Sequence, residues 1–159
     1  MAVAQNKKAY HNYFIEDKFE AGIELQGWEV KSARQNGVSL VESFVYFSKP
    51  KGAEGGAVQA VLKNAHFAPY EYGRVTEQDV RRDRRLLLRR TQIEKLHKMV
   101  ATKGVTCVVT KLYFNSRGLL KAEVALARGK HNYDKKQVLK ERDIKRETDR
   151  VTKATFTNR

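Results

Sequence analysis

The sequence has few of the features that stabilise secreted or membrane-spanning proteins. Cys107 is the only cysteine among 159 residues, so no disulfide can form within the chain, and a reducing cytoplasm fits. No apolar run approaches the roughly 18 residues that a membrane span requires, and residues 1–8 lack the apolar stretch of a secretory signal. We therefore expect a cytoplasmic protein with no membrane partner, in which Cys107 is a buried strand residue.

Residues suited to catalysis or to metal binding are also scarce. The four histidines are His11, His66, His97 and His131. They stand far apart, without the spacing of metal ligands. The glycine-rich loop at 52–56 is not followed by the Lys-Ser/Thr pair of a phosphate-binding loop. The sequence therefore predicts no enzyme, no metal site and no cofactor.

Positive charge is what the chain has in excess. It contains 32 Lys and Arg against 18 Asp and Glu, a formal net charge of +14. A domain this basic usually binds nucleic acid, and less often an anionic membrane surface. A merely solubilising surface charge is the weaker interpretation, because the excess is unevenly placed.

Six arginines surround three consecutive leucines, Leu86, Leu87 and Leu88, within residues 81–90. We call this segment the Arg–Leu block. Leucines in a row favour a core, whereas arginine pairs with phosphate and stacks on bases. The block is therefore predicted to be anchored in a folded domain and to face a polyanion.

The apolar pattern predicts a mainly β domain over residues 1–130. Two short strands are expected within 9–25, with a turn at Asp17-Lys18. Further strands are expected at 43–47, 58–67, 105–114 and 119–127. Six strands with short turns close most economically as an antiparallel barrel of the oligonucleotide-binding kind.

Helices are expected over 27–35 and from Thr91, where a Thr91–Glu94 capping box would open a helix that stops at Gly104. Residues 68–85 show no period and are expected to be irregular and exposed. The C-terminal tail, residues 131–159, is basic and poor in apolar residues. It is predicted to be disordered when free and helical against a partner.

Several segments share their order and spacing with one known family. They are residues 6–16, 20–23, 27–32, 85–88, 129–130 and 133–136. These segments closely resemble the SmpB family of SsrA-binding proteins, the small bacterial partners of transfer-messenger RNA (tmRNA). The resemblance covers roughly residues 5–153. It implies a six-stranded oligonucleotide-binding-like barrel with about three helices and a C-terminal tail.

The resemblance also implies a function in trans-translation. SmpB proteins bind the tRNA-like domain of tmRNA and bring it to the vacant A site of a 70S ribosome stalled on non-stop mRNA. The protein mimics the anticodon stem, and its tail senses the empty mRNA channel. The implied partners are tmRNA, the rRNA of the decoding centre and, indirectly, elongation factor Tu.

Particular residues take their expected roles from this resemblance. The expected RNA-binding residues are Glu20, Leu87, Arg89, Lys121, Arg128 and Lys130. The segment expected at the decoding centre is Tyr133, Asp134, Lys135 and Lys136. Three positions depart from the family: Arg89 replaces Asn or His, His131 replaces Lys, and Lys136 replaces Arg. Leu86 and Leu88 are expected to be core anchors, and residues 81–85 to give electrostatic support.

Two other functions stay open from the residues alone. A general ribosome-associated or single-strand-binding barrel would show no preference for the tRNA-like domain. An RNA-processing enzyme would need a clustered acid, histidine or metal site, which the sequence does not supply.

Overall fold

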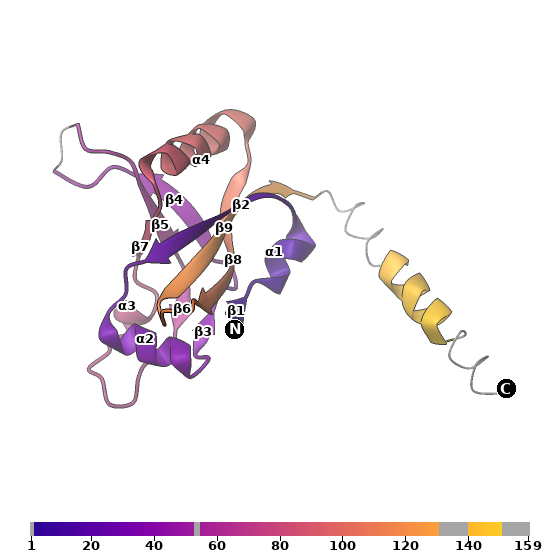
Figure 1. Ribbon diagram of the computed structural model, residues 1–159, viewed down its shortest axis with the longest axis horizontal. Coiled ribbons are helices and arrows are strands. Elements are labelled where there is room, and N and C mark those ends of the chain that lie inside the picture. Colours follow the sequence, from indigo (N-terminus) through magenta and orange to yellow (C-terminus); the bar gives the residue numbers. More distant parts are fainter. Residues whose placement is uncertain (1, 53–54, 131–139, 151–159) are drawn as a thin grey trace. The chain divides into compact units, whose positions relative to one another are not determined.

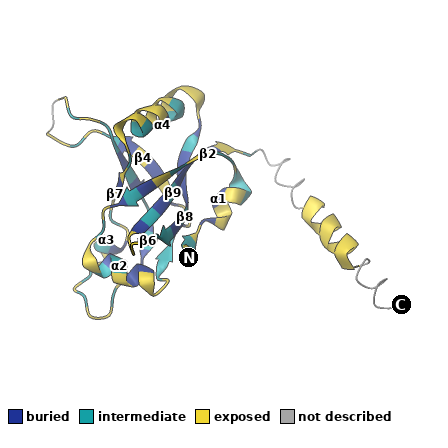
Figure 2. Cartoon of the chain, in the orientation of Figure 1, coloured by how far each residue is buried: buried dark blue, intermediate teal, exposed yellow. Residues whose placement is uncertain are grey.

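The computed structural model describes residues 2–52, 55–130 and 140–150, and the chain divides into two units. Met1–Gly129 forms the first unit (Figure 1). The second unit, Lys130–Arg159, contains a helix over residues 140–150 in which every residue is exposed (Figure 2). Disorder of the free tail stays a prediction, because residues 131–139 and 151–159 lie outside the described residues.

The first unit combines nine strands with four helices along its described residues. The strands are β1 (Ala2–Gln5), β2 (Tyr13–Ile23), β3 (Val38–Ser39), β4 (Phe44–Ser48), β5 (Gln59–Lys63), β6 (His66–Phe67), β7 (Arg84–Leu87), β8 (Thr106–Phe114) and β9 (Leu120–Gly129). The helices are α1 (Lys7–Asn12), α2 (Gly27–Arg34), α3 (Glu77–Val80) and α4 (Arg90–Lys103).

Seven strands form one antiparallel sheet in the order β1-β8-β9-β2-β7-β5-β4, and β3 pairs with β6 in a small second sheet. The prediction of a mainly β domain with an antiparallel sheet and several helices is confirmed. The predicted closed six-stranded barrel is not: among the described residues β1 and β4 are unpaired edges, so hydrogen bonding does not close the sheet. The large sheet has seven strands because β1 and β7 were not predicted, whereas the two strands predicted within 9–25 are the single strand β2.

The predicted pair of short strands within 9–25 is instead helix α1 followed by the single strand β2. Asn6 caps α1, because its side-chain oxygen accepts a hydrogen bond from the Ala9 backbone N–H at 3.1 Å. The predicted turn at residues 17–18 is a bulge, since Ile15 pairs with Ala127 but Lys18 with Ala125. A bulge bends a strand without ending its pairing.

The hydrophobic core is built mainly by the strands of the large sheet, which carry much of the buried colour in Figure 2. Alternating inward residues supply it, as period-two strands require. Its fully buried side chains include Leu62, Leu86, Leu112, Val124 and Leu126. Helix α4 lies at one end of the sheet and contributes the fully buried Leu96, whereas α2 and α3 lie at the other end (Figure 1).

Helix α4 matches the predicted helix over most of its length, but its first residue and its capping partner differ from the prediction. The helix begins at Arg90 and is preceded by Arg89 in extended conformation. The side-chain oxygen of Gln92 accepts the Arg89 backbone N–H at 3.2 Å, so the capping partner is Gln92 and not Glu94. Gly104 ends the helix with a φ of 62°, the left-handed conformation that favours glycine.

The middle of the Arg–Leu block is part of the fold. The expectation that residues 68–85 are irregular and exposed holds for residues 68–76, none of which is buried, but it is wrong for α3 and for Arg84, where a strand begins. Residues 84–87 form β7, between β2 and β5. Arg84 and Leu86 point inward and are buried, whereas Arg85 and Leu87 are exposed. A strand fits this sequence because its two faces alternate.

The buried guanidinium of Arg84 is paired with Glu29 of α2, at 2.9 Å, and both side chains are fully buried. Arg82 pairs with the same carboxylate at 2.7 Å. Two of the block's six arginines therefore serve the interior, which corrects their expected electrostatic role toward a partner. This pairing also holds β7 in place and so fixes the strand that carries Leu87.

Candidate nucleic-acid interface

A row of side chains crosses the outer face of the sheet at the middle of the Arg–Leu block. Leu87 of β7 pairs with Gly22 of β2, and Gly22 pairs with Lys121 of β9. Lys121 pairs in turn with Tyr113 of β8. Directly opposed residues share a face, so an exposed leucine, a lysine and a tyrosine are brought together from three distant segments.

Leu87 is 50% exposed although it is flanked by core residues. Gly22 makes room for it, because a Cβ at Gly22 would lie 3.2 Å from Leu87 Cβ and 3.4 Å from one of its methyl carbons. The leucine side chain therefore lies over the bare backbone of β2. Gly22 therefore belongs to the site, although the sequence analysis did not predict it as an RNA-binding residue.

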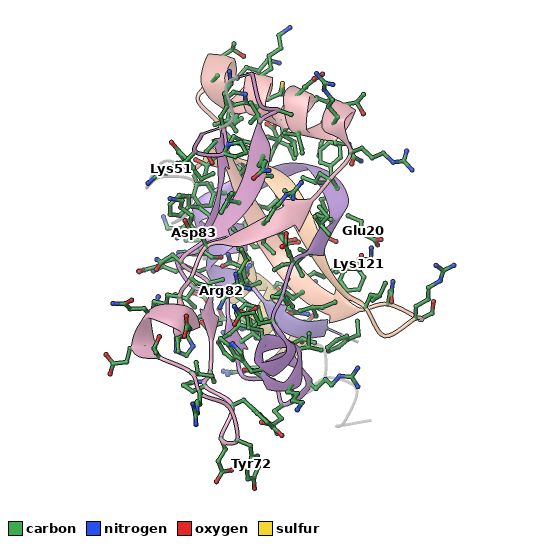
Figure 3. The ribbon with its side chains drawn as sticks, turned by 90° about the vertical axis from the view of Figure 1, so that its left-hand side faces the viewer. Glu20, Lys51, Tyr72, Arg82, Asp83 and Lys121 are labelled. Carbon is green, nitrogen blue, oxygen red and sulfur yellow. The ribbon has the colours of Figure 1, made fainter. Side chains whose placement is uncertain are left out.

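Glu20 lies beside this row, one pleat further along β2, and Figure 3 shows it on the same side as Lys121. The Tyr113 hydroxyl donates a hydrogen bond to its carboxylate. Desolvation, and next this hydrogen bond, raise the pKa of Tyr113 to about 12. Tyr113 thus stays protonated and orients Glu20, whose remaining lone pairs can accept from amino or hydroxyl groups.

Glu123 lies directly opposite Glu20, which would be unfavourable for two uncompensated carboxylates. Its charge is balanced by Lys18 at 3.1 Å and Lys111 at 3.4 Å, and Thr110 donates a hydrogen bond at 2.7 Å. Desolvation raises the pKa of Glu123, but the Thr110 hydrogen bond and the lysines lower it more, so the pKa lies below its ordinary value. Glu123 is thereby occupied internally, and Glu20 is the acid presented outward.

A hollow of about 280 Å³ lies next to the row. It is lined by Leu25, Val30, Leu87, Leu119 and Lys121 among others. Leu119, just before β9, is about as exposed as Leu87. Apolar walls beside a cation suit an unstacked base with its phosphate, which is how proteins read RNA loops.

The other predicted contact residues lie at the margins. Arg89 lies two residues after the end of β7 and is exposed. Arg128 lies near the far end of β9, where it pairs with Glu16 at 3.0 Å. Lys130 belongs to the second unit. The structure therefore brings Glu20, Leu87 and Lys121 together, places Arg89 beside them along the chain, and does not bring Arg128 to the same group.

The predicted tail contacts are not described. Tyr133, Asp134, Lys135 and Lys136, like His131, lie outside the described residues. Their roles stay predictions.

The arginines of the block differ in how they are paired within the described residues. Arg81 donates to Asn64 at 3.1 Å, and Arg90 pairs with Glu94 at 3.1 Å. The guanidinium groups of Arg85 and Arg89 make no such contact there. Strand alternation could have singled out Arg85, because it lies two residues before Leu87 and so shares its face.

The described residues give no support for a metal site, a reactive thiol or a membrane-spanning helix. That part of the chain has no group of three or more His, Cys, Asp or Glu placed to hold a metal ion. Burial raises the pKa of Cys107 to about 12, so the thiol is a structural side chain, as predicted. None of the described helices is both long and apolar enough to span a membrane.

A curved antiparallel sheet with a basic, partly apolar outer face is typical of nucleic-acid-binding β domains. Comparison with known proteins is more specific: residues 3–154 match the family described as SmpB protein. The chain belongs to the SmpB family.

Similar proteins cover nearly the whole chain. The SsrA-binding protein of Caldanaerobacter subterraneus subsp. tengcongensis is 45% identical over 151 residues, 95% of this chain and 90% of the relative. That of Streptomyces avermitilis is 48% identical over 152 residues, 96% of this chain and 81% of the relative. A chain in a solved structure of tmRNA–SmpB in the bacterial ribosome is 40% identical, with a TM-score of 0.63, over 85% of this chain and 92% of that chain.

Proposed function

We propose that this protein binds tmRNA through the outer face of β7, β2 and β9 and is required for trans-translation. The observation that carries the proposal is the cross-strand row of Leu87, Gly22 and Lys121, with Glu20 beside it. Leu87 supplies an apolar contact to an unstacked base, Lys121 a phosphate contact, and Glu20 an acceptor for amino or ribose hydroxyl groups. Membership of the SmpB family supports tmRNA as the RNA.

The protein acts in the cytoplasm on 70S ribosomes stalled on mRNA without a stop codon. It brings the tRNA-like domain to the vacant A site, where the protein takes the place of the anticodon stem. Elongation factor Tu takes part indirectly, through the tRNA-like end of the RNA. The likeness to a chain from a tmRNA–SmpB ribosome structure supports the ribosome as the partner.

The basic tail, residues 131–159, senses whether the mRNA channel is empty. An occupied channel excludes the tail sterically, whereas an empty one is lined by rRNA phosphates that attract it. Tyr133, Asp134, Lys135 and Lys136 are the residues proposed to meet the decoding centre. The protein acts by shape and charge and not as an enzyme.

A competition experiment tests the RNA specificity. The full-length protein is bound to the labelled tRNA-like domain of tmRNA, and either the same unlabelled RNA or ordinary tRNA competes at fixed salt. We expect tmRNA to compete at least roughly tenfold better, which corresponds to about 1.4 kcal/mol. Equal competition would support a general RNA-binding barrel instead.

The Leu87→Asp variant tests the site within the same assay. Leu87 is half exposed, so aspartate should fold normally but place a negative charge against RNA. Binding should fall strongly while the urea unfolding midpoint stays near that of the wild type. Normal RNA binding by this variant would show that the row is not the binding site.

A further inference from the structure

We infer that the RNA-binding surface continues across β7 onto β5 and β4, where Arg85 and Tyr46 form a second contact strip for unpaired nucleotides. The inference rests on the proposed function, because the RNA is the one that occupies the Leu87 row. We call the residues Tyr46, Val61 and Arg85 the β4–β7 strip.

The pairing of the strands places these three residues in one line. Tyr46 of β4 pairs with Val61 of β5, and Val61 pairs with Arg85 of β7. Their neighbours along each strand are buried, so the three point away from the core. The strip therefore lies one pleat from the Leu87 row on the same outer face of the sheet.

Tyr46 offers an aromatic surface for a base. Its side chain is 49% exposed, and Phe44, two residues earlier on the same face of β4, is also exposed. Lys63 Nζ lies 4.8 Å from the centroid of the Tyr46 ring. The lysine covers one face of the ring. An unpaired base can stack on the ring by using the other face or by displacing the lysine, which is then close enough to meet its phosphate.

Arg85 is the residue of the β4–β7 strip nearest to Leu87 along the chain, and it offers a contact for a phosphate. Its guanidinium makes no hydrogen bond or ion pair within the described residues, whereas the nearby Asp83 is paired with Lys63 at 3.6 Å. Figure 3 shows Asp83 apart from Glu20 and Lys121. Arginine without an internal partner binds phosphate oxygens in a two-pronged geometry.

Continuity argues for the same RNA rather than a separate ligand. Arg85 and Leu87 belong to one strand and one face, about 7 Å apart along it at the rise of a β-strand. A nucleotide chain spans roughly this distance between successive phosphates in extended single strands. An RNA strand whose base lies at Leu87 can therefore place the next phosphate at Arg85 and its base on Tyr46.

Equilibrium titration with the tRNA-like domain of tmRNA at several salt concentrations tests the strip. Tyr46→Ala should weaken binding roughly 5- to 100-fold, the range for losing one stacked base, and Tyr46→Phe should restore it because the ring is kept. Arg85→Gln should make the slope of the logarithm of the association constant against the logarithm of the salt concentration less steep by about 0.7 to 0.9. This change corresponds to the loss of one phosphate contact.

Matched controls come from the loop before α3, at the far end of the sheet. Tyr72 is 82% exposed and Arg74 is exposed, so Tyr72→Ala and Arg74→Gln make the same chemical changes elsewhere. Both should bind like the wild type at every salt concentration. If they weaken binding as much as the strip variants do, the strip has no special role and the inference is overturned.

Leu87→Asp in the same titration separates this inference from the proposed function. Wild-type binding by Tyr46→Ala and Arg85→Gln together with impaired binding by Leu87→Asp would overturn the strip alone. Wild-type binding by all three would overturn the proposed function as well. Unfolding curves for each variant identify any loss of binding that comes from loss of fold and not from the strip.

Discussion

Neutralising Glu29 should destabilise the protein more than any change to a surface ion pair. The Glu29 carboxylate accepts from Arg82 at 2.7 Å through two nitrogens and from Arg84 at 2.9 Å. It also accepts the backbone N–H of Gln26 at 2.8 Å. Glu29→Gln removes the negative charge and one acceptor oxygen, and leaves the buried Arg84 without a counter-charge.

The remaining contacts of Arg84 explain why it cannot escape to water. Its other N–H groups donate to the backbone carbonyls of Ala65, Asp79, Val80 and Arg82 at 2.9–3.2 Å. All five donors are therefore used, and the guanidinium lies 4.0 Å from the centroid of the Phe67 ring. Desolvation lowers the pKa of Arg84, but an arginine stays charged in practice.

Removing one partner of a buried ion pair costs about 3–5 kcal/mol. Whole domains have only about 5–15 kcal/mol of stability, so Glu29→Gln should remove about a fifth of it or more. Urea unfolding followed by the fluorescence of Trp28, the only tryptophan, measures the loss next to the mutated residue. The midpoint should move to clearly lower urea.

A surface pair provides the control. Glu94 pairs with Arg90 on α4 with both side chains mostly exposed, so Glu94→Gln should cost no more than about 0.5 kcal/mol. Adding Arg84→Met to Glu29→Gln should cost less than the sum of the single changes, by about 1–3 kcal/mol. A loss below about 1 kcal/mol for Glu29→Gln, or additive effects, would refute the reasoning.

Three further outcomes are expected. Gly22→Val should push Leu87 off the backbone of β2 and weaken RNA binding about tenfold in a filter-binding titration, with a stability loss near 1 kcal/mol; unchanged affinity would contradict the role of Gly22. Because its folded pKa is lowered, Glu123 stabilises the protein above its unfolded value of 4.5, and this contribution disappears as pH falls through the folded pKa. Urea unfolding should therefore show Glu123→Gln to be less stable than wild type at pH 7, with a difference that shrinks as pH falls below 4.5, and a pH-independent difference would argue against the Lys18 and Lys111 pairs. Deleting residues 133–159 should leave RNA binding largely intact but stop tagging of stalled chains in a translation extract, and continued tagging would exclude the sensor role of the tail.

Local patterns were enough to predict the elements with strong periodicity. The helix ending at Gly104 and the hairpin of β8 and β9 follow from spacing and turn residues that act within a few positions. Strand β7 was missed because its charge suggested exposure. Arg84 is buried only because Glu29, fifty-five positions earlier, neutralises it, and no local pattern records a partner at that distance.

The site residues were predicted from family resemblance, and their grouping has a geometric reason that no window of sequence contains. Leu87, Gly22 and Lys121 lie on three strands that are distant along the chain, and pairing register alone aligns them. The bulge in β2 shifts that register, so a prediction of two short strands could not have produced the row. Tyr113 was missed for the same reason, since its link to Glu20 spans ninety-three positions.

The pairing of the block's arginines changes how its charge should act on RNA. When the logarithm of the association constant is plotted against the logarithm of the salt concentration, each phosphate contact contributes about −0.7 to −0.9 to the slope. Six contacts would therefore contribute about −4 to −5. Glu29 holds both Arg82 and Arg84, and Glu94 pairs with Arg90, so these three guanidinium groups already have a carboxylate partner. Arg81 is bonded only to the neutral amide of Asn64. Arg85 and Arg89 are the two with unpaired guanidinium groups among the described residues. Three arginines of the block, Arg81, Arg85 and Arg89, thus have no carboxylate partner among the described residues, and the block should contribute about −2.1 to −2.7 to this slope. A much steeper dependence that Glu29→Gln left unchanged would show that the paired arginines also release counterions.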